Sequence, residues 1–111
     1  MKKLPQHGLI VYARACELLR AVMRANIADS ALRRQATEAA QSVCLNISEA
    51  AGRVTRADKA RAFTIARGEC VEASAAVEVA LISGAATEIA HTEVASIASE
   101  VYAMLTALIR R

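Results

Sequence analysis

The sequence predicts an all-α protein, an antiparallel up-down-up-down four-helix bundle. Alanine, which has the highest helix propensity, occurs 26 times in 111 residues, against one Pro and four Gly. Apolar residues recur at three- and four-residue steps along four segments, and no stretch alternates with period two. Only a few residues separate these segments, so consecutive helices must run antiparallel. The length suits one domain, residues 1–111.

The first two helices are expected over residues 8–25 and 31–51. Asp29 or Ser30 is placed to cap the second helix, and Gly52 stands where a helix usually ends in a left-handed turn. The first helix carries two apolar stripes and the second carries one at heptad-like spacing. These stripes are Leu9, Tyr12, Cys16, Leu19 and Met23; Val11, Leu18, Val22 and Ala25; and Leu32, Ala36, Ala39, Val43, Ile47 and Ala50.

The third helix is expected from Thr55 to about residue 83 and the fourth over residues 88–111. Thr55 and Asp58 resemble a capping box, Gly84 ends the third helix, and Thr87 can cap the fourth. Gly68 costs ~1 kcal/mol in mid-helix, which suggests that another backbone passes close to it. The predicted inner stripes are Phe63, Ala66, Cys70, Ala73, Val77 and Ala80, and Ala90, Val94, Ile97, Val101, Met104 and Leu108.

The high alanine content also predicts association between copies of the chain. Small side chains bury little area each, at ~25 cal/mol per Å² of apolar surface, so a solitary bundle with so few large core residues would be marginal. The second apolar stripe of the first helix supplies more burial if subunits pack together. We therefore expect a homo-oligomer with closed symmetry.

Charge is distributed unevenly along the chain, although the net charge is only +3. Residues 1–67 contain twelve basic and five acidic residues, a net charge of +7, whereas residues 68–111 contain two basic and six acidic residues, a net charge of −4. This asymmetry fits a basic surface that meets phosphate. It fits equally well an assembly in which opposite faces attract one another.

The cysteines and the N-terminus indicate a reducing cytoplasm. Cys16, Cys44 and Cys70 form an odd set without a C-x-x-C pair, and each lies among apolar neighbours. The chain begins without the long apolar stretch of a secretory signal. No uncharged run approaches the ~18 residues of a membrane span, so we expect no membrane partner.

One short motif is compatible with a metal site. Glu88 and His91 form an E-x-x-H, which places a carboxylate and an imidazole on one helix face, and di-iron bundles use two such motifs. Here the motif occurs once, the other histidine (His7) precedes the first helix, and Glu69 and Glu72 face no second histidine. We interpret Glu88 and His91 as solvated residues of a first helical turn.

No other pattern indicates catalysis. Ser42, Asn46 and Glu49 share one helix face, but no histidine is near them in sequence, so they are interpreted as a polar helix edge. The chain has no Gly-rich phosphate loop, and nothing near the three cysteines would lower a thiol pKa. We therefore expect no enzymatic activity, no metal and no cofactor.

The clearest functional signal is a basic cluster around the turn between the second and third helices. Clusters of this kind neutralise phosphates without reading base sequence. Aromatic residues for stacking on single strands are nearly absent, so backbone and shape contacts should dominate. The alternative is a solvated basic face. The candidate residues for binding nucleic acid are Arg53, Arg56, Lys59, Arg61 and Arg67.

Several motifs along the chain form a recognisable pattern. The most specific is segment 46–53, Asn-Ile-Ser-Glu-Ala-Ala-Gly-Arg, whose signature residues are Asn46, Glu49, Gly52 and Arg53. The opening segment 9–18 and parts of segments 32–43 and 63–72 extend the pattern over nearly the whole chain. It resembles the bacterial four-helix-bundle family whose best-known members are encoded by intervening sequences inside large-subunit ribosomal RNA genes. Thr37 and Glu38 stand where that family usually has two arginines.

The resemblance implies a non-enzymatic bundle that assembles into a five-fold ring. A similar bundle is the accessory protein of diversity-generating retroelements, in which a basic pentamer associates with nucleic acid and a reverse transcriptase. The leading hypothesis is therefore an oligomeric bundle that contacts RNA or DNA backbone. The alternative is a structural or adaptor protein that acts only through protein–protein contacts.

Overall fold

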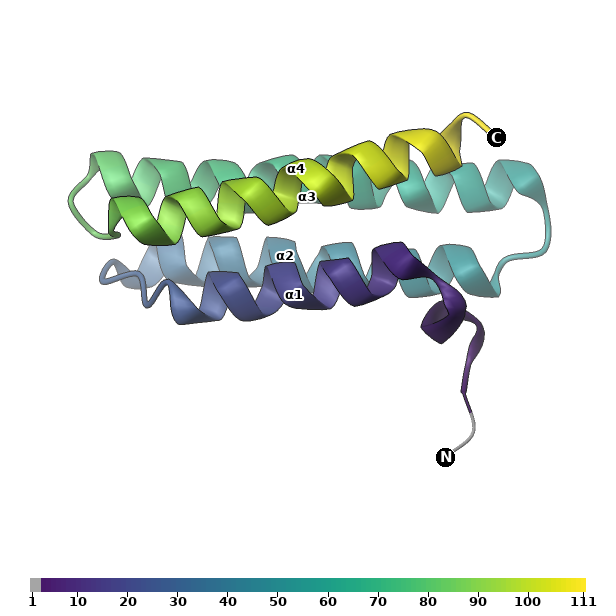
Figure 1. Ribbon diagram of the computed structural model, residues 1–111, viewed down its shortest axis with the longest axis horizontal. Helices are drawn as coiled ribbons and strands as arrows, with labels where there is room; N and C mark the ends of the chain where they lie inside the picture. The colour runs from purple at the N-terminus through teal and green to yellow at the C-terminus, as the bar shows by residue number, and fades with distance from the viewer. Residues whose placement is uncertain (1–2) are drawn as a thin grey trace.

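The computed structural model describes residues 3–111, and these form four α-helices and one short 3-10 helix without a strand (Figure 1). Each α-helix packs on the two beside it, and α1 closes the bundle against α4. Consecutive helices run antiparallel, as predicted. The elements are η1 (Pro5–Gly8), α1 (Ile10–Arg24), α2 (Ser30–Gly52), α3 (Arg56–Ile82) and α4 (Glu88–Ile109).

The caps predicted for three helices are present. The Asp29 carboxylate accepts a hydrogen bond from the Leu32 amide (2.9 Å), so Asp29 is the cap and Ser30 is the first residue of α2. The Thr55 and Thr87 hydroxyls accept bonds of 3.1 Å from amides three residues later. Each bond satisfies an amide that the first helical turn leaves without a partner.

Two glycines behave differently from each other at helix ends. Gly84 has φ +79 and ends α3, with its amide bonded to the Leu81 carbonyl and the Ala85 amide to the Ala80 carbonyl. That pair of bonds is a Schellman motif, in which a left-handed residue satisfies the last carbonyls. The left-handed turn expected at Gly52 is absent, because α2 ends instead through extended backbone at Arg53.

The core consists mainly of the predicted apolar stripes. All six stripe residues of α3 are buried, and so are five of the six on α2. Met23, which was assigned to a stripe of α1, is 63% exposed, and fully buried Leu105 on α4 was missed. The second stripe of α1, which was expected to supply burial between subunits, is already buried inside the subunit, so that expectation was wrong. The rotation of α1 turns Leu18 and Val22 inward and leaves the first stripe partly buried, with Met23 on the outer side.

The core is made largely of small residues. Thirteen of the 27 buried apolar residues are alanine, which lets the helices approach closely. Eleven large apolar residues remain exposed among the described residues, almost as many as the core contains. The single subunit therefore leaves much of its apolar surface uncovered.

The mid-helix glycine of α3 does not have the role expected of it. Gly68 is exposed, and a Cβ added there would meet no atom within 4 Å. No neighbouring backbone of the subunit passes close to it, so the explanation fails within the subunit. The position carries only the helix-propensity cost of glycine.

Helix α4 is the most apolar helix of the bundle. By length and composition it is long and apolar enough to cross a membrane, although Glu93 and Glu100 interrupt its uncharged runs. The lack of a long uncharged run in the sequence therefore did not exclude α4 as a candidate membrane span by length and composition. In the structure Val94, Val101 and Leu105 are buried inside the bundle. Only 28% of the most apolar 18-residue stretch of α4 is buried, however.

Candidate nucleic-acid interface

One end of the bundle collects basic residues from three parts of the chain. The α2–α3 turn and the C-terminus of α4 meet at this end, opposite the α1–α2 and α3–α4 connections (Figure 1). Glu49 near the end of α2 and Asp58 near the start of α3 are the acidic residues that flank the α2–α3 turn in sequence. We call this region the basic end; its residues are Arg53, Arg56, Lys59, Arg61, Arg110 and Arg111.

Arg53 is partly neutralised by its own helix. Its guanidinium donates a hydrogen bond to the Glu49 carboxylate one helical turn earlier, and this bond raises the pKa of Arg53. Both side chains are about half exposed, so water screens the pair. Arg53 therefore contributes less unbalanced positive charge to the basic end than its neighbours do.

Lys59 connects the start of α3 to the end of α2. Its half-buried ammonium donates to the carbonyl oxygens of Ala50 (3.2 Å) and Ala51 (3.4 Å). These carbonyls lie at the negative end of the α2 dipole, where a cation is stabilising. The contact fixes a positive charge beside the turn and leaves one of its three N–H donors for another acceptor.

Arg56 and Arg61 are the exposed basic residues at the start of α3. None of the four ion pairs found in residues 3–111 includes either of them. Asp58, which lies between them in sequence, belongs to no ion pair either, and its amide bonds to the Thr55 cap. Both guanidiniums are therefore available to an anion from solution.

Arg67 lies apart from the other predicted residues. Eleven residues separate it from Arg56, about 16 Å along the helix. It donates to the Thr106 hydroxyl (3.2 Å), and its guanidinium lies 5.4 Å from the centre of the Tyr102 ring. Half-buried Arg67 therefore belongs to the contact between α3 and α4.

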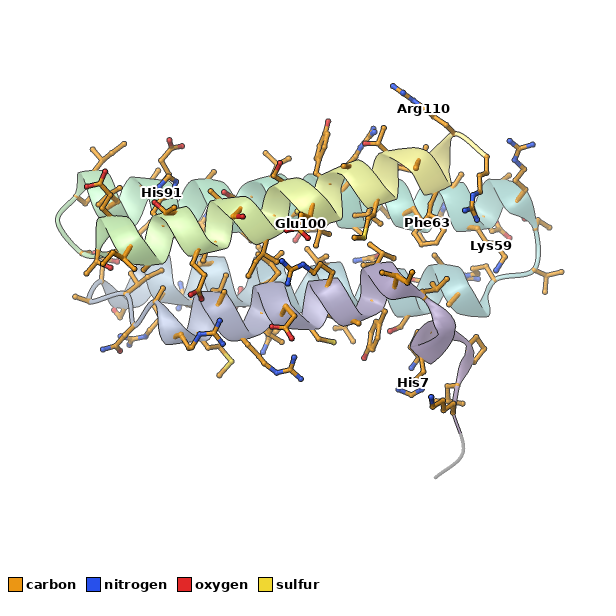
Figure 2. The ribbon with its side chains drawn as sticks, viewed as in Figure 1. His7, Lys59, Phe63, His91, Glu100 and Arg110 are labelled. Carbon is orange, nitrogen blue, oxygen red and sulfur yellow. The ribbon has the colours of Figure 1, made fainter. Side chains whose placement is uncertain are left out.

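Arg110 and Arg111 were not among the predicted site residues. They belong to the acidic part of the sequence, but antiparallel α4 returns them to the basic end. Arg111 lines the same cavity as Arg56 and Lys59, and Arg110 points away from the bundle (Figure 2). The predicted up-down topology already implied this placement, because the C-terminal ends of the second and fourth helices must lie at the same end of the bundle.

The signature segment of α2 makes contacts mostly within its own helix. Asn46 donates to the Ser42 carbonyl (2.9 Å) and hydroxyl (3.0 Å), while Glu49 pairs with Arg53. Burial raises the pKa of Glu69, which faces this edge from α3, and Glu72 raises it further. Gly52 is exposed in the last turn of α2.

The histidines lie at opposite ends of the bundle. His91 is near the start of α4 and His7 is in η1 (Figure 2), where its Nδ1 accepts from the Leu4 amide (2.9 Å). Within residues 3–111, no group of three or more His, Cys, Asp or Glu side chains is arranged to hold a metal ion. Glu88, the partner of His91 in the E-x-x-H motif, is exposed.

The cysteines occupy apolar positions as free thiols. Burial raises the pKa of Cys44 to about 12 and that of Cys70 to about 11, whereas Cys16 is half-buried between α1 and α2. The Cys70 thiol donates to the Ala98 carbonyl (3.2 Å) across α3 and α4. Neither buried thiol ionises appreciably near neutral pH.

Fold and surface together define an all-α four-helix bundle with one basic end. The chain belongs to the 23S rRNA-intervening sequence protein family, whose model matches residues 7–107. The crystal structure of a protein of unknown function from the S23 ribosomal protein family of Bacteroides thetaiotaomicron has the same fold, with a TM-score of 0.84 and 20% identity. That similarity covers 92% of this chain and all of the other. No curated protein sequence matches the chain.

Proposed function

We propose that this protein is a non-enzymatic, oligomeric bundle that binds the phosphate backbone of RNA or DNA through its basic end. The observation that carries the proposal is that Arg56 and Arg61 are exposed and belong to none of the ion pairs among the described residues. Arg56 also lies on the same face of α3 as the fixed ammonium of Lys59, three residues later. Such groups attract phosphates and release counterions when they bind them.

The rest of the charge distribution supports this location. Arg14 and Arg24 on α1 are paired with Glu100 and Glu93 on α4, so these charges balance one another inside the subunit. The basic end has only Glu49 and Asp58 against its six basic residues. The unbalanced positive charge of the chain is therefore concentrated where α2 meets α3.

Binding through this surface would not depend on base sequence. The charged groups of Arg and Lys contact phosphates, which are the same at every base, so these contacts carry no sequence information. Phe63, which lines a cavity at the basic end, is buried and offers no stacking platform on the outer surface. Shape and backbone contacts are expected to dominate.

Assembly into a homo-oligomer belongs to the same proposal. The exposed apolar residues and the poorly covered α4 support it, because a second copy would remove this surface from water. The family resemblance adds the expectation of a pentameric ring. Light scattering on a size-exclusion column measures the mass: five copies of 11.8 kDa support the ring, and a monomer at micromolar concentration overturns it.

A second candidate is an adaptor that acts only through protein contacts, with a reverse transcriptase or another protein as partner. An open groove of about 340 Å³ between α3 and α4 favours it, with exposed Val71 and Tyr102 on its walls. In that case the charges serve subunit contacts, and replacing Arg56 and Arg61 by Glu dissociates the oligomer. An unchanged mass after the substitutions excludes this role for the two arginines.

Fluorescence anisotropy with a structured RNA and a DNA duplex tests the proposed binding. We expect binding at 50 mM salt that weakens strongly at 200 mM, with a slope of log K against log salt of about −3 to −5 if four to six phosphates are neutralised. No binding at low salt, or affinity that does not depend on salt, overturns the proposal.

A further inference from the structure

A cavity of about 290 Å³ opens at the basic end between the start of α3, the end of α4 and the segment before α1. Most of its lining residues are apolar, and the buried ring of Phe63 is one of them. Figure 2 shows Phe63 and Lys59 on the same stretch of α3, with both side chains directed between the helix layers. The lining residues that matter here are Leu9, Phe63, Leu108, Arg56, Lys59 and Arg111.

The lining combines two chemistries. Three of its ten residues are cationic, and the other seven are apolar. None is acidic and none carries a side-chain hydrogen-bond acceptor. A compact ring with apolar faces, joined to an anion, matches both parts of this lining.

We propose that this cavity takes the base of an unpaired nucleotide while Arg56, Lys59 and Arg111 hold its phosphates. The inference rests on the proposed function and specifies the class of nucleic acid. Lys59 is already held in place by the Ala50 and Ala51 carbonyls, so it loses little freedom on binding. A guanidinium plane can also stack on a base, which suits the two arginines among the lining residues.

The size of the cavity favours one base over a larger group. Its volume lies at the lower limit of the ~300–1,000 Å³ common for ligand pockets, so it has no room for a base pair. A base inside a duplex is stacked and paired and would have to be extruded first. The surface should therefore prefer single strands, bulges or frayed ends. No side chain that lines the cavity accepts a hydrogen bond, so the N–H groups of a base find no side-chain partner there.

The wild-type protein provides the first test, in anisotropy titrations at 100 mM salt. The probes are a 12-nucleotide oligouridylate, an abasic phosphodiester strand of the same length, and a blunt 12-base-pair duplex. We expect the abasic strand and the duplex to bind about tenfold more weakly than the oligouridylate, within the range of base stacking in protein sites. Equal affinity for the base-containing and abasic strands overturns the inference.

Filling the cavity provides the second test. Ala60 lines it, whereas Ala57 on the same turn of α3 is exposed and does not. Ala60→Phe, with Ala60→Leu as a milder variant, should remove the preference for the oligouridylate and leave affinity for the abasic strand unchanged. Ala57→Phe and Ala57→Leu are the matched controls. They should change neither the preference for the oligouridylate nor the affinity for the abasic strand. Thermal melting checks the folding of each variant.

The outcomes separate the two proposals. If no probe binds to the wild-type protein at low salt, the proposed function fails. If all three probes bind with similar affinity, or Ala60→Phe in a folded protein leaves the preference intact, backbone binding remains and the base pocket is wrong. If the Ala60 variants do not fold, the affinities of the wild-type protein for the oligouridylate and the abasic strand still decide whether the base pocket exists.

Discussion

Arg14 on α1 and Glu100 on α4 lie 86 positions apart in the sequence and form two parallel hydrogen bonds. The guanidinium Nε donates to Oε2 (2.8 Å) and Nη2 donates to Oε1 (2.9 Å). Arg24 and Glu93 form a second link between the same helices (2.6 Å). Part of the charge asymmetry of the chain therefore reflects attraction between the first and fourth helices within one subunit.

The Arg14–Glu100 pair makes stability depend on pH in a definite direction. The hydrogen bond from Arg14 lowers the pKa of Glu100 in the folded protein, below its value in the unfolded chain. The pair therefore stabilises at neutral pH, and its contribution is lost as the pH falls through the folded pKa, below about 4.3. Glu100→Gln should lower the melting temperature at pH 7, and this deficit should shrink as the pH is lowered toward 2.5.

Glu38→Gln is the control for that comparison. Glu38 is exposed on α2 and belongs to none of the ion pairs among residues 3–111, so its removal should leave the melting temperature nearly unchanged at both pH values. A Glu100→Gln deficit that persists at pH 2.5 would show that the pair does not act through ionised Glu100.

Gly68 within α3 and Gly84 just after it should respond in opposite directions to substitution by alanine. Gly84 has φ +79, a left-handed conformation that costs a residue with a Cβ about 1–2 kcal/mol, so Gly84→Ala should destabilise. Gly68 lies in an exposed helix interior with open space around it, and Gly68→Ala should stabilise by up to about 1 kcal/mol. Urea unfolding of both variants measures the difference.

A destabilised Gly68→Ala variant would contradict this account of the isolated subunit. It would indicate that another copy approaches α3 at this glycine. Repeating the measurement across protein concentrations separates the two cases, because only an intersubunit clash depends on association.

The three cysteines should differ in reactivity toward a thiol reagent. Burial raises the pKa of Cys44 to about 12 and of Cys70 to about 11, so only about 1 in 10⁴ and 1 in 10³ of these thiols ionise at pH 8. Half-buried Cys16 should therefore be alkylated first by iodoacetamide. Peptide mass spectrometry over time identifies the order, and rapid labelling of Cys44 in the native protein would contradict it.

The fold was predictable from the sequence because its determinants are local or periodic. The caps at Asp29, Thr55 and Thr87 depend on a side chain and an amide three residues later. The inner face of α3 depends on spacing alone. Errors arose where the rotation of a helix or the way it ends decides the outcome. Met23 faces outward because of the rotation of α1, and Gly52 does not adopt the left-handed conformation expected at the end of α2.

The candidate site was predictable only in part. The residues around the α2–α3 turn are neighbours in sequence, so their cluster is visible before folding. The contact of Arg67 with Tyr102 depends on how α3 meets α4, and the cavity above Phe63 exists only when three segments meet. Arg110 and Arg111 could have been assigned from the predicted topology, since the second and fourth helices end on the same side.

Charge reversal at the two ends of the bundle tests the central claim most directly. Arg61→Glu changes the basic end, and Arg34→Glu makes the same change in net charge at the start of α2, at the other end of a molecule 44 Å long. At 0.1 M salt charges are screened over about 10 Å, so the two effects are separable. In RNA titrations we expect Arg61→Glu to weaken binding about tenfold or more and Arg34→Glu to leave it within about twofold. Equal weakening by both variants would show that the basic end is not the binding surface.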